Sequence, residues 1–391
     1  MAGIYIHIPF CKSRCIYCAF YSTTRSKMRQ RYVDAVCKEL IRRYTPIQTD
    51  RIETIYIGGG TPSLLTIGQL RQLLENVWHT YTVAGEPEVT VEVNPDDVTA
   101  ELALGMCSIG VNRISMGAQT FDDRRLRLLN RRHTASQITA AVKTLRGAGF
   151  NNVSIDLMYG FPGETMDDWR RDIEAAQRLD VEHISAYCLT VEENTPLHKM
   201  LYCKATDDSK HNALCAKLPD EELERGMYYK LVDHLTAAGY EHYELSNFAQ
   251  PGYRSRHNSS YWQDIPYIGV GAAAHSYDGR RRSWNVSDID TYINEVEEEK
   301  WKAEEGHCWL ESTEWEELDS NTHYNDRITV ALRTCEGLPL SELTDEQRHY
   351  LLHSAKRYLD SGLLELQNER IKLTREGLFV SDMVMGDLIY A

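Results

Sequence analysis

The stretch Gly3-Ile-Tyr-Ile-His-Ile-Pro-Phe-Cys11-Lys-Ser-Arg-Cys15-Ile-Tyr-Cys18 joins a short strand pattern to three cysteines in a C-x3-C-x2-C spacing. Three thiolates this close together can hold one compact cluster, and soft thiolates select iron–sulfur clusters, zinc or copper. Structural zinc usually takes four protein ligands, and His7 could supply the fourth only if the strand bent back. A disulfide would leave one of the three thiols unpaired. The spacing therefore favours an iron–sulfur cluster, and a four-iron cluster held here would keep one iron open.

Composition limits the class of protein. The chain has 391 residues, of which 42% are hydrophobic, so it can bury large cores and its length suggests two or three domains. No apolar run approaches membrane-spanning length, and ten scattered cysteines fit a reducing cytosol. A formal charge of -15 argues against a general nucleic-acid binder, because phosphate neutralisation needs basic patches. We expect a cytoplasmic protein with no integral membrane segment and no nucleic-acid partner.

Strand patterns alternate with amphipathic helix patterns along the first half of the chain. The predicted strands are residues 3–8, 54–57, 88–93, 113–117, 153–158 and 183–187, and the helix patterns between them include residues 66–79 and 136–145. Six βα units predict an α/β protein with a parallel sheet wrapped by helices. In such sheets and barrels, ligands bind at the C-terminal ends of the strands.

Polar and glycine-rich segments follow the predicted strands. The turn at residues 58–62 reads Gly-Gly-Gly-Thr-Pro, and its glycines allow the backbone to approach a small ligand closely. Glu92, Gln119 and Asp156 end the next three strands, and the last strand leads into Gly-Phe-Pro-Gly-Glu-Thr at residues 160–165. Each residue alone could be a helix cap or a turn. Two carboxylates and an amide together suit a ligand with ribose hydroxyls and an ammonium group.

The cysteine loop, the glycine-rich turn, Glu92, Gln119 and Asp156 resemble the radical S-adenosylmethionine superfamily. Within it the chain is similar to the branch of oxygen-independent coproporphyrinogen III oxidases and HemW-type haem chaperones. The resemblance covers essentially the whole chain and implies a partial (β/α)6 barrel with a small C-terminal winged-helix-like domain. It also implies that the three thiolates hold a 4Fe-4S cluster whose open iron is chelated by S-adenosylmethionine. Reductive cleavage, which needs an electron donor, would give methionine and a 5'-deoxyadenosyl radical.

The resemblance assigns roles residue by residue. Cys11, Cys15 and Cys18 would bind the cluster. Gly59 would lie against the methionine part of the cofactor, with Gly60 and Thr61 beside it, while Glu92 would bind ribose hydroxyls and Tyr5 would pack near the cluster. Members of the oxidase branch can hold a second S-adenosylmethionine, and the matching positions here are Tyr17, Gln119, Arg131 and Asp156. These four residues could equally shape one site.

Two departures separate the branches. The oxidase usually carries a further cysteine two residues beyond the third, where this chain has Phe20. The N-terminal extension that precedes the cluster loop in the oxidase is also not seen. We therefore expect no coproporphyrinogen III oxidase activity.

The middle of the chain supplies positive evidence for the other branch. His257-Asn-Ser-Ser-Tyr-Trp262 is similar to the H-N-x-x-Y-W motif of the haem chaperones. Imidazole is a common ligand of haem iron, and flanking aromatic rings can stack on the macrocycle. His257 is therefore the leading candidate haem ligand, and His275 is a weaker one that could instead lie near the cofactor. The alternative for both is a partly buried, hydrogen-bonded structural histidine.

We expect three parts: residues 1–218 as the radical S-adenosylmethionine barrel, 219–300 as an extension with the H-N-x-x-Y-W motif, and 301–391 as the C-terminal domain. Polar residues 197–218 contain His198, Cys203, His211 and Cys215 in no metal-binding spacing, which indicates an exposed loop. Residues 295–317 are rich in carboxylates, with Trp301, Trp309 and Trp315 between them. This composition predicts a solvated face or a linker between domains, with a domain boundary near Gly306.

In the C-terminal domain the sequence predicts helices at 326–334 and 345–359, a hairpin at 363–366 and 370–373, and a last helix. This pattern resembles a winged-helix unit, and with no basic stripe it is expected to be a lid or docking surface. The leading hypothesis is a haem chaperone that transfers haem to acceptor proteins. The alternatives are an oxygen-independent coproporphyrinogen III oxidase and a radical enzyme with another substrate.

Overall fold

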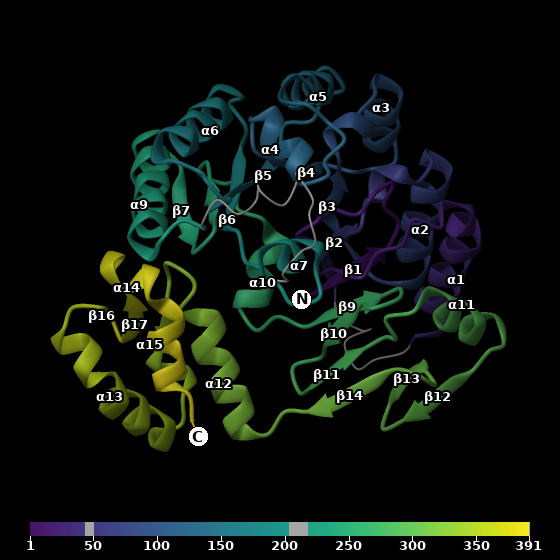
Figure 1. Cartoon of the computed structure of the whole chain (residues 1–391). Helices are drawn as coiled ribbons and strands as arrows, with labels where there is room; N and C mark the ends of the chain where they lie inside the picture. Colours follow the sequence, from purple (N-terminus) through teal and green to yellow (C-terminus); the bar gives the residue numbers. More distant parts are fainter. Residues whose placement is uncertain (44–50, 203–217, 391) are drawn as a thin grey trace.

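The computed structural model describes residues 1–43, 51–202 and 218–390 (Figure 1). Six strands lie side by side in chain order, each parallel to the next. They are β1 (Ala2–Ile8), β2 (Ile52–Gly59), β3 (Val83–Val93), β4 (Arg113–Gln119), β5 (Val153–Tyr159) and β6 (His183–Cys188). All six strand predictions and the α/β class are confirmed, although β3 begins earlier than predicted.

Helices cover the outer face of these strands (Figure 1). They are α1 (Arg29–Arg42), α2 (Ile67–Thr80), α3 (Ala100–Ser108), α4 (Asp123–Leu128), α5 (Ala135–Gly147) and α6 (Met166–Arg178). The helix α2 begins with a capping box in which Thr66 accepts a hydrogen bond from Gln69 N and the Gln69 side chain bonds back. The helices predicted at residues 66–79 and 136–145 correspond to α2 and α5.

The two faces of the sheet differ in chemistry because side chains alternate along each strand. The outer face is apolar and packs on the helices, as Ile4, Ile6 and Ile8 of β1 show. The strand register places a row of mainly polar side chains on the other, inner face: Tyr5, His7, Thr54, Tyr56, Glu88, Thr90, Glu92, Arg113, Ser115, Ser154, Asp156 and His183. The apolar outer face therefore packs on the helices, and the polar inner face carries the candidate site residues.

The sheet continues beyond both edges of the six parallel strands to twelve strands. Beyond β6 lie β8 (Asn247–Ala249) and β7 (Glu241–Glu244), which follow the helix α9 (Glu221–Ala237). Beyond β1 lie β9 (Tyr267–Val270), β10 (His275–Tyr277), β11 (Arg281–Trp284) and β14 (Glu314–Glu317). The strand β9 is parallel to β1, and the three strands after it are antiparallel to their neighbours. In sequence, the short helix α10 (Arg256–Trp262) follows β8 at one edge of the sheet and precedes β9 at the other. It carries the H-N-x-x-Y-W motif.

Residues 295–317 are not a linker and have no domain boundary at Gly306, but most of their carboxylates are exposed, as the alternative prediction of a solvated face requires. This segment contains the end of α11 (Ile289–Glu297) and the hairpin of β12 (Trp301–Glu304) and β13 (His307–Leu310), and then β14 joins the main sheet. Gly306 turns between β12 and β13 with a φ of +80°, a backbone conformation that favours glycine. Trp309 is only 2% exposed, between the rings of His307 and Trp315. The carboxylates of β12 and β14 lie on the same strands as Trp301 and Trp315, which are half-buried.

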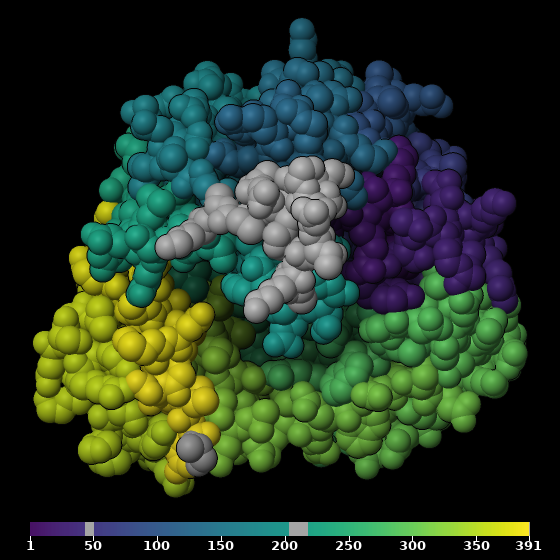
Figure 2. Space-filling model, in the orientation of Figure 1, coloured from purple at the N-terminus to yellow at the C-terminus, as the bar shows by residue number. Residues whose placement is uncertain are grey.

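The C-terminal unit has a hydrophobic core of its own, around Tyr324, Leu351 and Ile371. It comprises α12 (Ser320–Ala331), β15 (Leu338–Pro339), α13 (Asp345–Asp360), β16 (Leu364–Gln367), β17 (Arg370–Leu373), α14 (Arg375–Phe379) and α15 (Ser381–Leu388). The predicted helices and hairpin are confirmed, with the first helix displaced towards the N-terminus. Figure 2 shows a recess between this unit, in yellow and green, and the teal segments of the barrel.

The predicted exposed loop at residues 197–218 is only partly described. Residues 197–202 belong to the helix α7 (Pro196–Tyr202), so the loop prediction is wrong there, and Leu197 is buried. The ring of His198 lies 5.0 Å from that of Tyr202. Cys203, His211 and Cys215 lie outside the described residues. Within the described ranges, every helix is too short or too polar to cross a membrane.

Candidate functional site

The cysteine loop follows β1 directly, so the three thiols lie at the C-terminal edge of the parallel strands. Cys11, Cys15 and Cys18 are free and partly exposed. The hydroxyl of Thr61 donates to Cys11 Sγ at 3.6 Å, and Nη1 of Arg131 donates to Cys15 Sγ at 3.6 Å. Burial raises the pKa of the Cys11 and Cys18 thiols, so binding a metal there would release protons.

The three thiols are neighbours on one loop but are not gathered into a finished metal site. In the part of the chain that the structure describes, no three His, Cys, Asp or Glu side chains take up a metal-binding arrangement. The donor set nevertheless suits an iron–sulfur cluster, because three accessible thiols share one short loop and two receive hydrogen bonds that favour a thiolate.

The glycine-rich turn at the end of β2 is pressed against β1 and the cysteine loop. Gly59 has a φ of +109°, and a Cβ built there would lie 2.5 Å from Cε1 of His7. A Cβ at Gly60 would lie 2.8 Å from the carbonyl oxygen of Phe10. Both positions therefore need glycine. The buried Thr61 accepts a hydrogen bond from Asn94 Nδ2 at 3.1 Å, which fixes the turn to the end of β3.

Two buried carboxylates lie on the inner face near this turn. Glu92 accepts hydrogen bonds from the Tyr56 hydroxyl at 2.8 Å and from Gly59 N at 3.0 Å. Burial raises the pKa of Glu92 to about 7 and that of Asp156 to about 6. The guanidinium of Arg113, itself 1% exposed, opposes both shifts. Each carboxylate can therefore change its protonation state near neutral pH.

Arg131 connects the cysteine loop to the end of β4. Its Nη2 donates to Asn94 Oδ1 at 2.7 Å and to the Gly117 carbonyl at 2.5 Å. Gln119 is buried with a φ of +67°, a conformation that costs free energy for a residue other than glycine. Burial raises the pKa of Tyr17, and the charge of Arg131 opposes that shift. The charge of Arg131 also lowers the pKa of Asp156, which opposes the effect of burial.

The structure therefore brings together the residues that the sequence singled out around the cluster loop. Tyr5 belongs to this group through a 3.0 Å hydrogen bond between its hydroxyl and His7 Nδ1. Arg113, Tyr56 and Asn94 were not predicted as site residues, and His7 was considered only as a possible zinc ligand. Side chains alternate between the two faces along β1, β2 and β4, so Arg113, Tyr56 and His7 each share a face with a predicted site residue. This alternation was the sequence signal for them.

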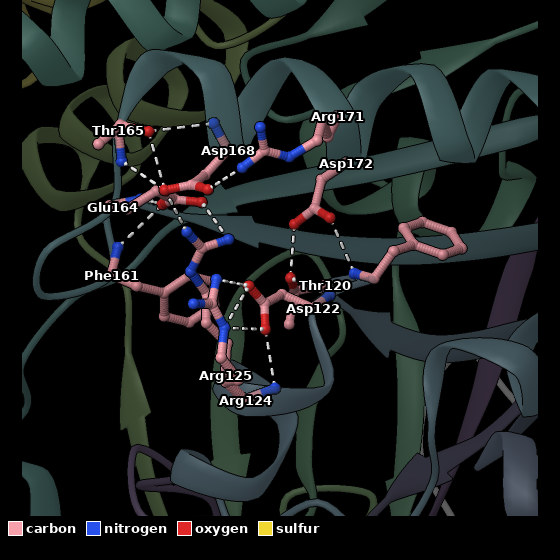
Figure 3. Close-up of polar contacts among 12 residues, drawn as sticks. Thr120, Asp122, Arg124, Arg125, Phe161, Glu164, Thr165, Asp168, Arg171 and Asp172 are labelled. Carbon is pink, nitrogen blue, oxygen red and sulfur yellow. Dashed lines mark hydrogen bonds and ion pairs between the residues drawn. The ribbon is translucent and has the colours of Figure 1, made fainter.

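The Gly-Phe-Pro-Gly-Glu-Thr segment is held by the polar cluster in Figure 3. Glu164 accepts hydrogen bonds from Gly160 N at 2.7 Å and Phe161 N at 3.0 Å, and its other oxygen lies 3.5 Å from Arg125 Nη1. Asp172 accepts hydrogen bonds from the Thr120 hydroxyl at 2.5 Å and Phe121 N at 2.9 Å (Figure 3). These contacts hold the loops that follow β4 and β5, just beyond Gln119 and Asp156.

His257 contacts the same inner face nearer the N-terminal ends of the strands, on the side of Tyr56 and Thr54. It is 1% exposed, and its ring stacks on Tyr56 at 5.1 Å. Its Nδ1 shares a 2.8 Å hydrogen bond with the Thr54 hydroxyl, and its Nε2 shares a 2.9 Å bond with the Tyr261 hydroxyl. Burial lowers the pKa of His257 to about 3. In this structure both ring nitrogens of His257 are therefore hydrogen-bonded, so a bond to haem iron would require one of these contacts to break.

The helix α10 is fixed at this end of the barrel by Glu88. The carboxylate accepts hydrogen bonds from the backbone N–H groups of Arg256 and His257, each at 2.9 Å. A carboxylate at a helix N-terminus satisfies unpaired donors and favours the helix dipole. The first residue of the motif is thus part of the packing that closes the barrel.

His275 is placed differently. It is exposed on β10, and its ring stacks on Trp284 at 5.9 Å with an angle of 26°. Burial and the charge of Arg282 lower its pKa, and the charge of His275 in turn contributes to the lowered pKa of His7. His275 therefore lies near His7 and the residues that were predicted to bind the cofactor.

Comparison with known proteins gives the family. The Radical SAM superfamily matches residues 5–176, and the HemN C-terminal domain matches residues 318–380. The heme chaperone HemW of Mycobacterium tuberculosis is 33% identical over 99% of this chain and 94% of its own length. The chain belongs to the HemW family. The HemW proteins of Bacillus subtilis and Lactococcus lactis are 32% and 36% identical over 99% and 77% of this chain and 98% and 76% of their own lengths.

A solved structure of a radical SAM enzyme has the same fold. Coproporphyrinogen III oxidase (HemN) from Escherichia coli matches with a TM-score of 0.79 and 21% identity, over 99% of this chain and 90% of that one. Membership of the radical SAM superfamily implies a 4Fe-4S cluster and S-adenosylmethionine. The cysteine loop and the inner-face carboxylates are the parts of this HemW-family chain that suit those groups.

Proposed function

We propose that this chain binds haem and transfers it to acceptor proteins, with a 4Fe-4S cluster and S-adenosylmethionine as its resident groups. The observation that carries this proposal is the similarity to curated heme chaperones along nearly the whole chain. Phe20 adds to it, because it stands where the related oxidases carry a further cysteine and is 73% exposed beside the cluster loop.

Cys11, Cys15 and Cys18 would hold the cluster, which would supply one-electron redox chemistry at this edge of the sheet. The hydrogen bonds from Thr61 and Arg131 to two of the sulfurs would stabilise their negative charge. These two residues also contact Asn94, so the same contacts would keep the loop in place against β3.

The backbone of Gly59, Gly60 and Thr61 would bind the methionine end of the cofactor. Glu92 would exchange one of its hydrogen bonds for ribose hydroxyls, and this contact favours its ionised form. Tyr5 would pack beside the cofactor. The four residues Tyr17, Gln119, Arg131 and Asp156 would either complete this site or hold a second S-adenosylmethionine.

The barrel at residues 1–218 would carry these groups, residues 219–300 would close it and line the haem site, and residues 301–391 would cover that site or dock an acceptor. The proposal needs an electron donor as a further partner. It places the protein in the cytoplasm, where its thiols stay reduced.

The test is a haem titration on anaerobically reconstituted protein, followed by mixing with apomyoglobin as a haem acceptor. We expect a saturable Soret band and transfer to the acceptor. A parallel assay measures turnover of coproporphyrinogen III. Turnover without haem binding would assign the chain to the oxidase alternative and overturn the proposal, and so would the lack of both activities.

A further inference from the structure

The inner face of the sheet continues past β1 onto the added strands. Tyr267 of β9 pairs with Gly3 of β1 on one side and with Tyr277 of β10 on the other. His275 lies two residues from Tyr277 and therefore projects to the same face. On β11, Trp284 pairs with His275. Imidazole and indole thus extend the row that begins with Tyr5 and His7.

The opposite face of these strands is covered. Ser276, Ser283 and Arg281 alternate with the residues of the inner face and are buried. A small pocket on that side is lined by Ser276, Ser283, His307 and Trp309, so the hairpin of β12 and β13 packs there. The exposure of His275 therefore follows from the face on which it lies.

Histidines on the inner face fall into two kinds. His7, His183 and His257 are buried, and both ring nitrogens of each one have a hydrogen-bond partner: Tyr5 and the Tyr21 carbonyl for His7, Ser154 and Tyr243 for His183, Thr54 and Tyr261 for His257. His275 is exposed, and neither of its ring nitrogens is hydrogen-bonded to a residue in the described ranges. Only this imidazole of the four has a free lone pair to offer without breaking a buried contact.

The surroundings of His275 suit a planar aromatic macrocycle. Trp284 stacks on its ring, and Tyr267 and Tyr261 pack edge to face at 4.7 Å on the same side. Arg282 pairs with Tyr277 across the strands and lies on this face, where ion pairs with Asp326 and Glu316 balance its charge. Aromatic rings pack on a porphyrin, and a propionate would bind Arg282 by replacing one of these two carboxylates.

We propose that His275, and not His257, is the ligand of haem iron in this chain. The inference rests on the proposed function, because it names the iron ligand of that haem site. A bond forms between an imidazole nitrogen of His275 and the iron, and a water ligand leaves. No electron is transferred, and the neutral imidazole loses no proton.

The same geometry gives His257 another role. Its contacts join β2, through Thr54 and Tyr56, to α10, through Tyr261. It is a positioning residue that holds the motif helix against the barrel. Gly269 has a comparable role for His275, because a Cβ there would lie 1.9 Å from the carbonyl oxygen of His275. Only glycine lets β10 lie this close to β9.

The experiment compares cluster-loaded wild type with His275→Ala, His257→Ala and His349→Ala. His349 is exposed on α13 in the C-terminal unit and serves as the matched control. Haemin is titrated, and the Soret band and the electron paramagnetic resonance of the ferric iron are recorded. We expect His275→Ala to lose the nitrogen-ligand signature and to bind about tenfold more weakly or worse. Added imidazole should restore the signature, and the other two variants should keep it.

The outcomes separate the inference from the proposed function. If wild type binds no haemin, the proposed function itself fails, and the inference with it. If wild type binds haemin and His275→Ala has the same spectrum and affinity, the inference is wrong while the function stands. Loss of the signature in His257→Ala alone would return the ligand to the motif helix and would also overturn the inference.

Discussion

At the scale of single residues, Glu92 combines burial with contacts that suit an ionised carboxylate. Its pKa of about 7 lies above the ordinary value of 4.5, so the folded chain binds more protons than the unfolded chain between these pH values. Its contribution to the free energy of unfolding is therefore fully present below pH 4.5 and is lost as the pH rises through 7. Binding of ribose hydroxyls to the carboxylate would recover part of that loss.

We predict that Glu92→Gln gains stability relative to wild type as the pH rises from 5 to 8. The expected change in the difference in unfolding free energy is on the order of 1–3 kcal/mol. Chemical denaturation of cluster-loaded protein without S-adenosylmethionine measures it. As a control, Asp122→Asn should show no such trend, because the pKa of Asp122 is lowered to about 2. A pH-independent difference for Glu92→Gln would contradict the assigned pKa.

Glu92→Gln should also weaken cofactor binding. Hydrogen bonds to a charged group are worth about 1.5–3 kcal/mol, so we expect an affinity for S-adenosylmethionine lower by about tenfold to a hundredfold. Equilibrium binding above pH 8, where the wild-type carboxylate is ionised, gives the clearest comparison. Equal affinities there would remove Glu92 from the proposed site.

Gln119 stores backbone strain at the end of β4. A residue other than glycine in the left-handed region costs about 1–2 kcal/mol. We predict that Gln119→Gly is more stable than Gln119→Ala by about 1 kcal/mol, although alanine is usually the more favourable residue. Thermal unfolding of the two variants measures the difference, and both should lose affinity for S-adenosylmethionine. Greater stability of the alanine variant would mean that Gln119 is not strained.

At the scale of elements, one buried ion pair fastens the added strands to the barrel. Glu39 and Arg43 of α1 are both about 1% exposed and lie 2.8 Å apart. Glu39 also accepts hydrogen bonds from Gly271 N and from Tyr292 and Asn285, while Arg43 donates to the Gly269 carbonyl. The strand that precedes His275 is therefore held from α1.

We predict that Glu39→Ala destabilises the protein by about 3–5 kcal/mol, because it leaves Arg43 charged, buried and unpaired. The matched control is Glu297→Ala, which breaks the exposed pair of Glu297 with Arg31 and should cost less than about 1 kcal/mol. Denaturant titration compares the two. Similar losses in both variants would contradict the role given to the buried pair.

At the scale of the whole molecule, two hydrophobic cores meet at a polar junction. Ion pairs cross it between Arg254 and Glu336, Arg282 and Asp326, and Arg375 and Asp233. A cavity of about 240 Å³ lies there, lined by Trp262 of the motif and by Arg254 among others. Junctions of this kind between separate cores permit relative motion.

We predict that calorimetry resolves more than one unfolding transition. The unit from Tyr324 to Leu388 has its own core, and its contacts with the barrel combine the packing of Leu378 and Phe379 with several ion pairs, so its unfolding need not be fully coupled to that of the barrel. Raising the ionic strength should separate the transitions further, because salt screens those pairs. A single transition that is unaffected by salt would show that the two cores unfold together.

Much of the barrel could be predicted from the sequence because its signals are local. The cysteine spacing, the glycine-rich turn and the six strand patterns each lie within a few residues, and parallel strands must bring their C-terminal ends to one edge. The added strands could not be predicted, because segments of three or four residues carry little pattern. The pairing that attaches β9 to the barrel joins residues that are far apart in sequence, Tyr267 and Gly3.

The sequence by itself determined the cofactor chemistry. Three clustered thiols are typical ligands of an iron–sulfur cluster, and the strand-end carboxylates suit a ligand with ribose hydroxyls and an ammonium group. Only the tertiary structure decided which histidine is available. His257 and His275 both lie among aromatic residues in sequence, but one is buried with both nitrogens bonded and the other projects from the inner face. Burial depends on what packs against a side chain from distant parts of the chain, and local sequence does not record it.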